Sequence, residues 1–268
     1  MNTPALTDLE SLARQAGALL RAGFGRADQI HYKSEIDVVT DTDRLAEDFL
    51  IREIKGQFAG HSIVAEESGE TPGRIPGDKS PGYSRVWYID PMDGTVNFAH
   101  GLPHFGVSIG FAADGVMRCG VVYDPMRDEC FSAERGVGAW LNGAAIRASG
   151  ASDLNTSLLA TEFGYDIRSH PQNNLDQYAY FTLHTQGVRR TGSAALDLCY
   201  AACGRFDGYW ELRLKPWDVA AGGLIAELAG ARVCKVDGEA DYVTPPCSIL
   251  AAAPGIHRQM LEVIVSFQ

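Results

Sequence analysis

The sequence predicts a layered α/β protein with two lobes that share a cleft. Two helical patterns open the chain, antiparallel strand patterns occupy residues 104–148, and strands alternate with helices from about residue 150. Antiparallel strands followed by α/β alternation are typical of packed sheet and helix layers. A chain of 268 residues with 46% hydrophobic content can bury a large core. We therefore predict an N-terminal α+β lobe over residues 1–150 and a C-terminal α/β lobe over residues 151–268.

The first elements follow from apolar spacing. Apolar residues recur at helical intervals over residues 5–23 and 43–58, and Asp41 or Thr42 is the expected N-cap of the second helix. A short apolar strand is predicted over residues 62–65, directly before Glu66. Residues 69–84 are rich in Gly, Pro, Ser and charge, which predicts a surface loop.

The remaining elements are marked by alternating apolar runs and turn dipeptides. A buried strand is predicted over residues 86–89, and a helix begins near Thr95. Asp114-Gly115 and Asn142-Gly143 are hairpin signals between antiparallel strands at 104–113, 116–123, 129–133 and 139–141. The second half predicts strands near 158–162, 206–212, 231–235 and 248–253, and helices near 172–184, 193–203, 218–229 and 255–265.

Composition limits the partners. The formal net charge is −11, which disfavours nucleic acid and anionic membranes, so neither is expected as a partner. A phosphate-bearing substrate would then need local positive charge, which bound cations can supply. The six cysteines show no zinc spacing, no signal peptide is recognisable, and no apolar run reaches about 18 residues. A cytoplasmic protein is expected.

Four acidic residues stand where a strand or loop meets a turn or helix: Glu66, Asp90, Asp93 and Asp218. Taken singly, Asp93 or Thr95 could cap a turn, and Asp218 could cap a helix. A carboxylate at the edge of a core is costly unless it is paired or bound to a metal. Together the four form an all-oxygen set that suits Mg²⁺ or Mn²⁺ and not zinc.

The turn after the 86–89 strand has the residue types of a metal and phosphate site. Asp90 is positioned to bridge two ions, and Pro91 fixes the turn. Gly94 allows the backbone to approach a ligand closely. Thr95 begins a predicted helix, whose first N–H groups favour a phosphate.

These residues resemble the inositol monophosphatase family of Mg²⁺-dependent, lithium-sensitive phosphatases. Residues 90–98 (Asp-Pro-Met-Asp-Gly-Thr-Val-Asn-Phe) are similar to the first family signature, and residues 217–222 (Trp-Asp-Val-Ala-Ala-Gly) to the second. Further similar elements lie at 37–43, 65–68 and 192–195, with Glu211 following. The resemblance runs in order from about residue 6 to 265. It implies a layered αβαβα sandwich of the sugar-phosphatase type, with an antiparallel sheet in the N-terminal half and a mixed sheet with helices in the C-terminal half.

The resemblance also implies roles for particular residues. The first Mg²⁺ would be held by Glu66, Asp90 and the carbonyl of Met92, and the second by Asp90, Asp93 and Asp218. Glu66 would help to hold a third, weaker ion and would act in catalysis together with Thr95 and Asp43, which orient the attacking water. The substrate would be held by Gly94, Thr95, Gly192, Ser193, Ala194, Glu211 and Asp218. Mn²⁺ is an expected substitute for Mg²⁺, whereas Li⁺ and Ca²⁺ are expected inhibitors.

The implied function is hydrolysis of inositol monophosphate, or of a related polyol or sugar monophosphate, by metal-activated water. The enzyme would be an inositol-1-monophosphatase-like phosphoric monoester hydrolase, expected as a homodimer. An acid at position 211 should repel a second phosphate. Lys215, Arg189, Arg190 and Arg213 nevertheless keep bisphosphates open.

Other activities in the superfamily stay open as well. Its members also act on 3′-phosphoadenosine nucleotides, fructose 1,6-bisphosphate, histidinol phosphate or NADP. A regulatory binding protein on the same fold is a further alternative. A haloacid-dehalogenase-type phosphatase is disfavoured, because Asp90 and Asp93 are three residues apart and strand alternation would require two.

Overall fold

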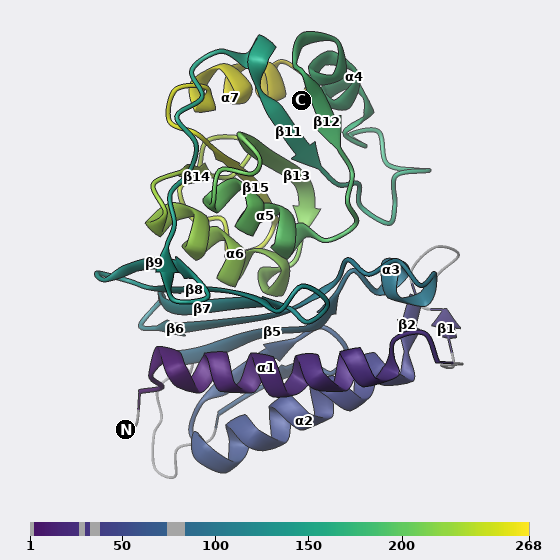
Figure 1. The fold of residues 1–268 in the computed structure, drawn as a ribbon, viewed down its shortest axis with the longest axis vertical. Helices are drawn as coiled ribbons and strands as arrows, with labels where there is room; N and C mark the ends of the chain where they lie inside the picture. The colour runs from purple at the N-terminus through teal and green to yellow at the C-terminus, as the bar shows by residue number, and fades with distance from the viewer. Residues whose placement is uncertain (1–2, 27–29, 33–37, 74–83, 268) are drawn as a thin grey trace.

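Helices and sheets alternate in five layers in the computed structural model, which describes residues 3–26, 30–32, 38–73 and 84–267 (Figure 1). Helices α1 (Leu6–Gly23) and α2 (Asp41–Gln57) cover one face of an eight-stranded sheet. Helices α5 (Ala194–Ala202) and α6 (Pro216–Leu228) lie between that sheet and a five-stranded sheet. Helices α4 (Leu175–His184) and α7 (His257–Ser266) form the outer layer. The predicted layered α/β sandwich is therefore confirmed.

The large sheet has the strand order β10-β9-β8-β7-β6-β5-β3-β4. Its strands are β3 (Ser62–Ala65), β4 (Gly69–Thr71), β5 (Arg85–Asp93), β6 (Gly106–Ala113), β7 (Val116–Asp124), β8 (Glu129–Glu134), β9 (Gly138–Leu141) and β10 (Ala144–Ala145). The predicted hairpins join β6 to β7 and β9 to β10. Neighbouring strands are antiparallel except for β3 and β5, which pair in parallel with Ala65 beside Ile89.

The small sheet is mixed, as predicted, with the order β12-β11-β13-β15-β14. Its strands are β11 (Leu158–Thr161), β12 (Gly187–Arg189), β13 (Gly208–Leu214), β14 (Arg232–Cys234) and β15 (Cys247–Ala252). β12, β11 and β13 are parallel neighbours, so their carboxyl ends share one edge. In α/β proteins such an edge is the usual location of a ligand.

Alternation along β5 assigns its two faces. Trp87 and Ile89 are fully buried against the layer of α1 and α2. Tyr88 packs instead against the core that contains α5 and α6. Because side chains two apart share a face, Asp90 points to the same side as Tyr88, toward α6.

Several local expectations need correction. The N-cap of α2 is neither Asp41 nor Thr42 but Thr40, whose hydroxyl accepts a hydrogen bond from the Asp43 N–H. The expected 69–84 loop begins with strand β4, which pairs with β3, and residues 74–83 lie outside the described residues. The short strands β1 (Ile30–Tyr32), β2 (Val38–Thr40) and β12 were not expected. Asp37 of the 37–43 element also lies outside the described residues.

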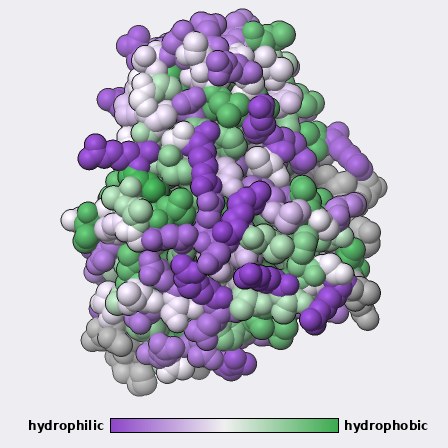
Figure 2. All heavy atoms as spheres, viewed as in Figure 1, coloured by the Kyte–Doolittle hydropathy of each residue, from purple (hydrophilic) through white to green (hydrophobic). Residues whose placement is uncertain are grey.

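The division into two lobes at residue 150 stays a prediction, because α5 and α6 contact both sheets. In the described part of the chain, no helix is long and apolar enough to span a membrane. The face shown in Figure 2 carries hydrophilic residues across its middle, with hydrophobic residues scattered around them.

Candidate active site

The end of β5 changes course between its two aspartates. The register against β6 shifts between Asp90 and Asp93, so the strand leaves regular pairing where the acids lie. Asp90 is 2% exposed, and its Oδ1 accepts a hydrogen bond of 2.9 Å from the Met92 N–H. Neither Asp93 nor Thr95 caps the next helix. The N-cap of α3 (Thr95–Ala99) is Gly94, which has no side chain to do so.

Asp93 lies on the same strand as Asp90, and the other two predicted acids are brought to Asp90 by different elements. Glu66 follows β3, the parallel neighbour of β5, and its N–H donates to the Ile89 carbonyl at 3.2 Å. Ser108 of β6 pairs opposite Asp90, and its hydroxyl donates to the Trp217 carbonyl at 3.2 Å. Asp218, the next residue, is the third residue of α6 and not its N-cap; its Oδ2 accepts from the Lys215 N–H at 2.7 Å.

The acids influence one another strongly. Burial raises the pKa of Asp90 well above its ordinary value, and the charges of Glu66, Asp93 and Asp218 raise it further. Burial also raises the pKa of Asp218, with added repulsion from Glu66 and Asp93. Crowded carboxylates of this kind lose their mutual repulsion when a cation binds between them. The donor set therefore fits a divalent cation that prefers oxygen ligands.

The four acids lie in one region but do not form a complete metal-binding site. Within the described residues, no three Asp, Glu, His or Cys side chains converge on one ready-made metal centre. Two carboxylate oxygens are turned toward protein donors instead. Asp218 Oδ2 faces the Lys215 N–H, and Asp93 Oδ2 accepts from the Ser193 hydroxyl at 2.5 Å and the Ala195 N–H at 2.7 Å.

Thr95 is hydrogen-bonded to a buried carboxylate. Its Oγ1 lies 2.8 Å from Asp43 Oδ1 and 3.0 Å from the Met92 carbonyl, so one hydroxyl proton has two possible acceptors. The other oxygen of Asp43 accepts from the N–H and hydroxyl of Thr40, at 2.8 and 2.6 Å. Burial raises the pKa of Asp43 from 3.8 to about 6, although these hydrogen bonds favour its ionised form.

Gly94 joins this turn to the 190–195 segment. Its φ of 101° lies in the left-handed region that favours glycine. A Cβ at this position would lie 3.0 Å from the His104 carbonyl oxygen and 3.2 Å from that of Gly192. A side chain would therefore be strained here, and the backbones of Gly94 and Gly192 lie side by side.

The predicted substrate residues gather on this side of the turn. Ser193 is the N-cap of α5, and Ala194 is the first residue of that helix; both are buried. Asn97 holds the segment in place by donating to the Thr191 and His104 carbonyls, each at 2.8 Å. Glu211 on β13 is buried and accepts from the Tyr209 hydroxyl. Burial raises its pKa, and so do the charges of Glu162, Asp218 and Asp93.

Glu162 was missed by the sequence reasoning. It is buried, it accepts a hydrogen bond from the Gly192 N–H, and Arg190 Nε lies 3.3 Å from its Oε2. Burial is the main reason that its pKa rises to about 7. The signal was available, because Glu162 directly follows an apolar strand, as Glu66 does.

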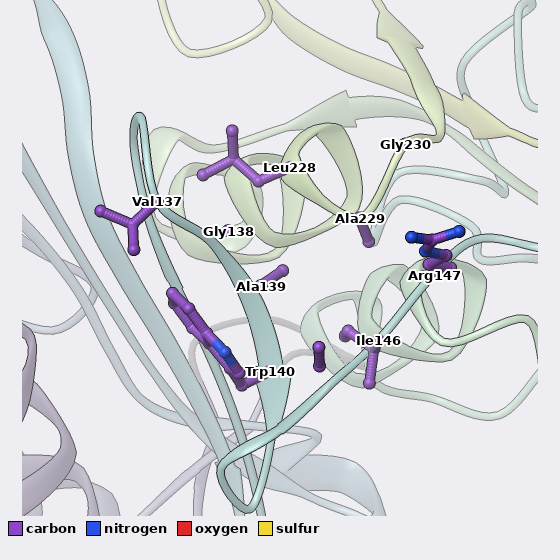
Figure 3. Close-up of a pocket in the computed structure, with 10 residues that line it drawn as sticks. Val137, Gly138, Ala139, Trp140, Ile146, Arg147, Leu228, Ala229 and Gly230 are labelled. Atoms are coloured by element: carbon purple, nitrogen blue, oxygen red, sulfur yellow. The ribbon is translucent and has the colours of Figure 1, made fainter.

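Two cavities lie outside this constellation, and none of the predicted site residues lines either. The smaller, of about 370 Å³, is a surface hollow between Val137, Trp140 and the end of α6 at Leu228 (Figure 3). The larger, of about 760 Å³, is lined by Val64, Tyr88 and Pro216 among others. The candidate site is therefore defined by its converging polar groups and not by cavity volume.

The five layers and the acidic cluster at the strand ends match the architecture of a layered α/β protein with an oxygen-rich cation site. The chain belongs to the inositol monophosphatase family, whose model matches residues 2–267. This is a family of metal-dependent phosphatases, generally with Mg²⁺, and membership supports hydrolase activity on phosphate esters.

Individual relatives are similar over nearly the whole chain. The chain is 42% identical to the inositol-1-monophosphatase of Synechocystis sp., covering 94% of this chain and 85% of the relative. It is also 42% identical to a protein named Nus factor SuhB from Vibrio cholerae, covering 94% and 92%. The solved structure of inositol monophosphatase from Anabaena (Nostoc) sp. PCC 7120 superposes with a TM-score of 0.84 at 40% identity, covering 97% and 95%.

Proposed function

We propose that this chain is a Mg²⁺-dependent phosphomonoesterase that hydrolyses inositol monophosphate or a related polyol or sugar monophosphate. The carrying observation is that Asp90 is buried close to three other carboxylates, so that burial first and the charges of Glu66, Asp93 and Asp218 second raise its pKa. Because the net charge of the chain is −11, bound cations would supply local positive charge that attracts a phosphate to this region. The name of the Synechocystis relative supports the same substrate class.

The proposed metal ligands are Glu66, Asp90, the Met92 carbonyl, Asp93 and Asp218, for two to three ions. When bound, the ions would offset the phosphate charge and lower the pKa of the attacking water. The backbone N–H groups of Gly94 and Thr95 would hold the phosphate oxygens.

Thr95 and Asp43 would orient the attacking water and accept its proton. In the proposed step, Thr95 Oγ1 accepts a hydrogen bond from the water while its own proton points to Asp43 Oδ1, 2.8 Å away. This arrangement leaves the Met92 carbonyl, the other possible acceptor at 3.0 Å, available as a ligand. Glu66 would also help to orient the water. Phosphoryl transfer depends mainly on such positioning and on charge stabilisation.

The leaving alcohol would face the 190–195 segment and Glu211. Glu211 would accept hydrogen bonds from substrate hydroxyls, with Gly192, Ser193 and Ala194 forming the adjacent backbone. Its neighbours Glu162 and Asp218 are also acidic, so a polyol is favoured over a second phosphate.

The test is phosphate release by the purified protein from inositol 1-phosphate, fructose 1,6-bisphosphate, 3′-phosphoadenosine 5′-phosphate, histidinol phosphate and NADP. We expect Mg²⁺-dependent turnover that is highest on inositol 1-phosphate, supported by Mn²⁺, inhibited by Li⁺ and Ca²⁺, and abolished by EDTA. Asp93→Asn should remove turnover. Absence of Mg²⁺-dependent release from all five substrates would contradict the proposal.

A regulatory role is a second candidate, favoured by the name of the Vibrio cholerae relative. A purely binding function should survive Asp93→Asn, whereas catalysis should not. The same variant therefore separates the two functions. Homodimer formation stays a prediction that light scattering can check.

A further inference from the structure

Arg213 has an unusual backbone conformation beside the candidate site. Its φ is 59°, in the left-handed region that is costly for residues with a side chain. The other described non-glycine residues with positive φ are all Asp or Asn, which tolerate this region. Arg213 is the one long side chain among them. It stands where the register of β13 against β15 shifts, between Glu211 and Leu214.

The side chain of Arg213 forms a bidentate ion pair with Asp166, which lies in a segment distant in sequence. Its Nη1 donates to Asp166 Oδ2 at 2.8 Å, and its Nη2 lies 2.7 Å from Asp166 Oδ1. The guanidinium also lies against Gly164, where an added Cβ would be 3.2 Å from Nη2. Its Nε is buried without a hydrogen-bond partner among the described atoms. Arg213 therefore carries two local costs, which a glycine would avoid.

The segment that contains Asp166, residues 163–168, starts at the candidate site. It follows β11, whose carboxyl end lies beside that of its parallel neighbour β13. Glu162, directly before it, bonds to Gly192 and interacts electrostatically with Asp93 and Glu211. At this end Arg190 reaches Glu162 and stacks over Phe163, 5.7 Å from the ring centroid. The segment is thus fixed by Arg190 at one end and by Arg213 farther along.

We propose that Arg213 is a specificity-determining residue. Together with Asp166 it fixes residues 163–168 as the outer wall on the leaving-group side, and so limits the size of the alcohol that the site accepts. The selection is by size and not by charge, because the guanidinium is already paired with a carboxylate. This inference rests on the proposed phosphatase function.

Two variants remove the ion pair between Arg213 and Asp166 in different ways. Arg213→Gly removes the side chain and relieves the backbone, whereas Asp166→Ala removes only the partner. Both should raise the KM for inositol 1-phosphate about tenfold, with kcat changed less than about twofold. The kcat/KM for a bulky nucleoside 2′-monophosphate, relative to that for inositol 1-phosphate, should rise about tenfold in both. Arg213→Lys keeps the charge without the two-pronged geometry and should be intermediate.

Thermal melting provides the structural control. Arg213→Gly should melt at or above the temperature of the wild type, because glycine accepts the φ of 59°. A lower melting temperature with an unchanged ratio of the two kcat/KM values would overturn the proposal, because the ion pair between Arg213 and Asp166 would then have only a structural role. An active wild type with unchanged ratios in both variants overturns the role of Arg213 alone. A wild type that releases no phosphate from any substrate overturns the proposed function as well.

Discussion

Replacing Asp43 by Asn should stabilise the metal-free protein at pH 8 while it damages catalysis. Asp43 has no exposed surface, and its pKa is raised from 3.8 to about 6, mainly by burial. A carboxyl group whose pKa is higher in the folded state is harder to ionise there. It therefore lowers stability as the pH rises from about 4 through 6, and the full cost is present above the folded pKa. Asparagine resembles the protonated acid and avoids this cost.

The size of the effect follows from the two pKa values. The interval between 3.8 and about 6 corresponds to about 3 kcal/mol, at 1.36 kcal/mol per tenfold change in the ionisation constant. Urea unfolding in EDTA should thus show Asp43→Asn more stable than the wild type by up to about 3 kcal/mol at pH 8, with little difference at pH 4. Asp48→Asn, on the exposed side of the same helix, is the matched control and should show no such gain.

Activity should change in the opposite direction. An amide N–H facing Thr95 would donate to its Oγ1 and direct the hydroxyl proton to the Met92 carbonyl, 3.0 Å away. That carbonyl would then be occupied, and the attacking water would lose its proton path. We expect kcat to fall by about 10²–10⁴. A variant that is equally destabilised at pH 8 and pH 4, or that keeps wild-type kcat, would refute this reasoning.

Three further predictions concern the same site. Mg²⁺ at a fixed concentration, about 100 times its Kd at pH 8, should raise the melting temperature by ~5–10 °C at that pH. At pH 5 the same concentration should raise it much less, because the raised pKa values of Asp90 and Asp218 let protons compete with the ion. An equal rise at both pH values would contradict this. Gly94→Ala should lower the free energy of unfolding in urea by about 2 kcal/mol more than Gly101→Ala does. Both glycines have positive φ, but of the two only Gly94 faces backbone atoms within 4 Å. Equal losses of stability would argue against a steric clash at Gly94. Ser193→Ala removes the 2.5 Å hydrogen bond to Asp93, so kcat/KM should fall about 10- to 100-fold, with unchanged kinetics as the contrary result.

The sequence was most informative where chemistry and local structure coincide. Residues 90–98 combine a strand end, two acids and a required glycine within a few residues, so the turn was predictable. The predicted N-cap of α2, Asp41 or Thr42, was wrong because Thr40, Asp41 and Thr42 are consecutive residues whose types all favour an N-cap. Only the position of Asp43, which bonds back to Thr40, decides among them. The periodicity of apolar residues locates a helix end only to within one or two residues, so it does not choose among three consecutive residues.

The roles of Glu162 and Arg213 depend on strand order, which periodicity does not reveal. Strand β12 has only three residues, too few to show an alternating pattern. Its pairing with β11 nevertheless brings Gly192 to Glu162, 30 residues earlier in the chain. The pairing of β11 with β13 likewise brings Asp166 to Arg213. Each pair is distant in sequence, and no local motif connects its members.

Parallel pairing explains why the site lies where it does. In the described part of the large sheet, β3 and β5 are the one parallel pair, and their carboxyl ends carry Glu66 and Asp90. In the small sheet the parallel strands β12, β11 and β13 deliver the 190–195 segment, Glu162 and Glu211 to a second edge. Asp218 on α6, which packs between the sheets, lies within electrostatic range of both groups. In the proposed function the first edge handles phosphate and metal, and the second selects the alcohol. Because separate segments form the two edges, substitutions such as those at Arg213 can change substrate preference while the residues of the chemical step stay intact.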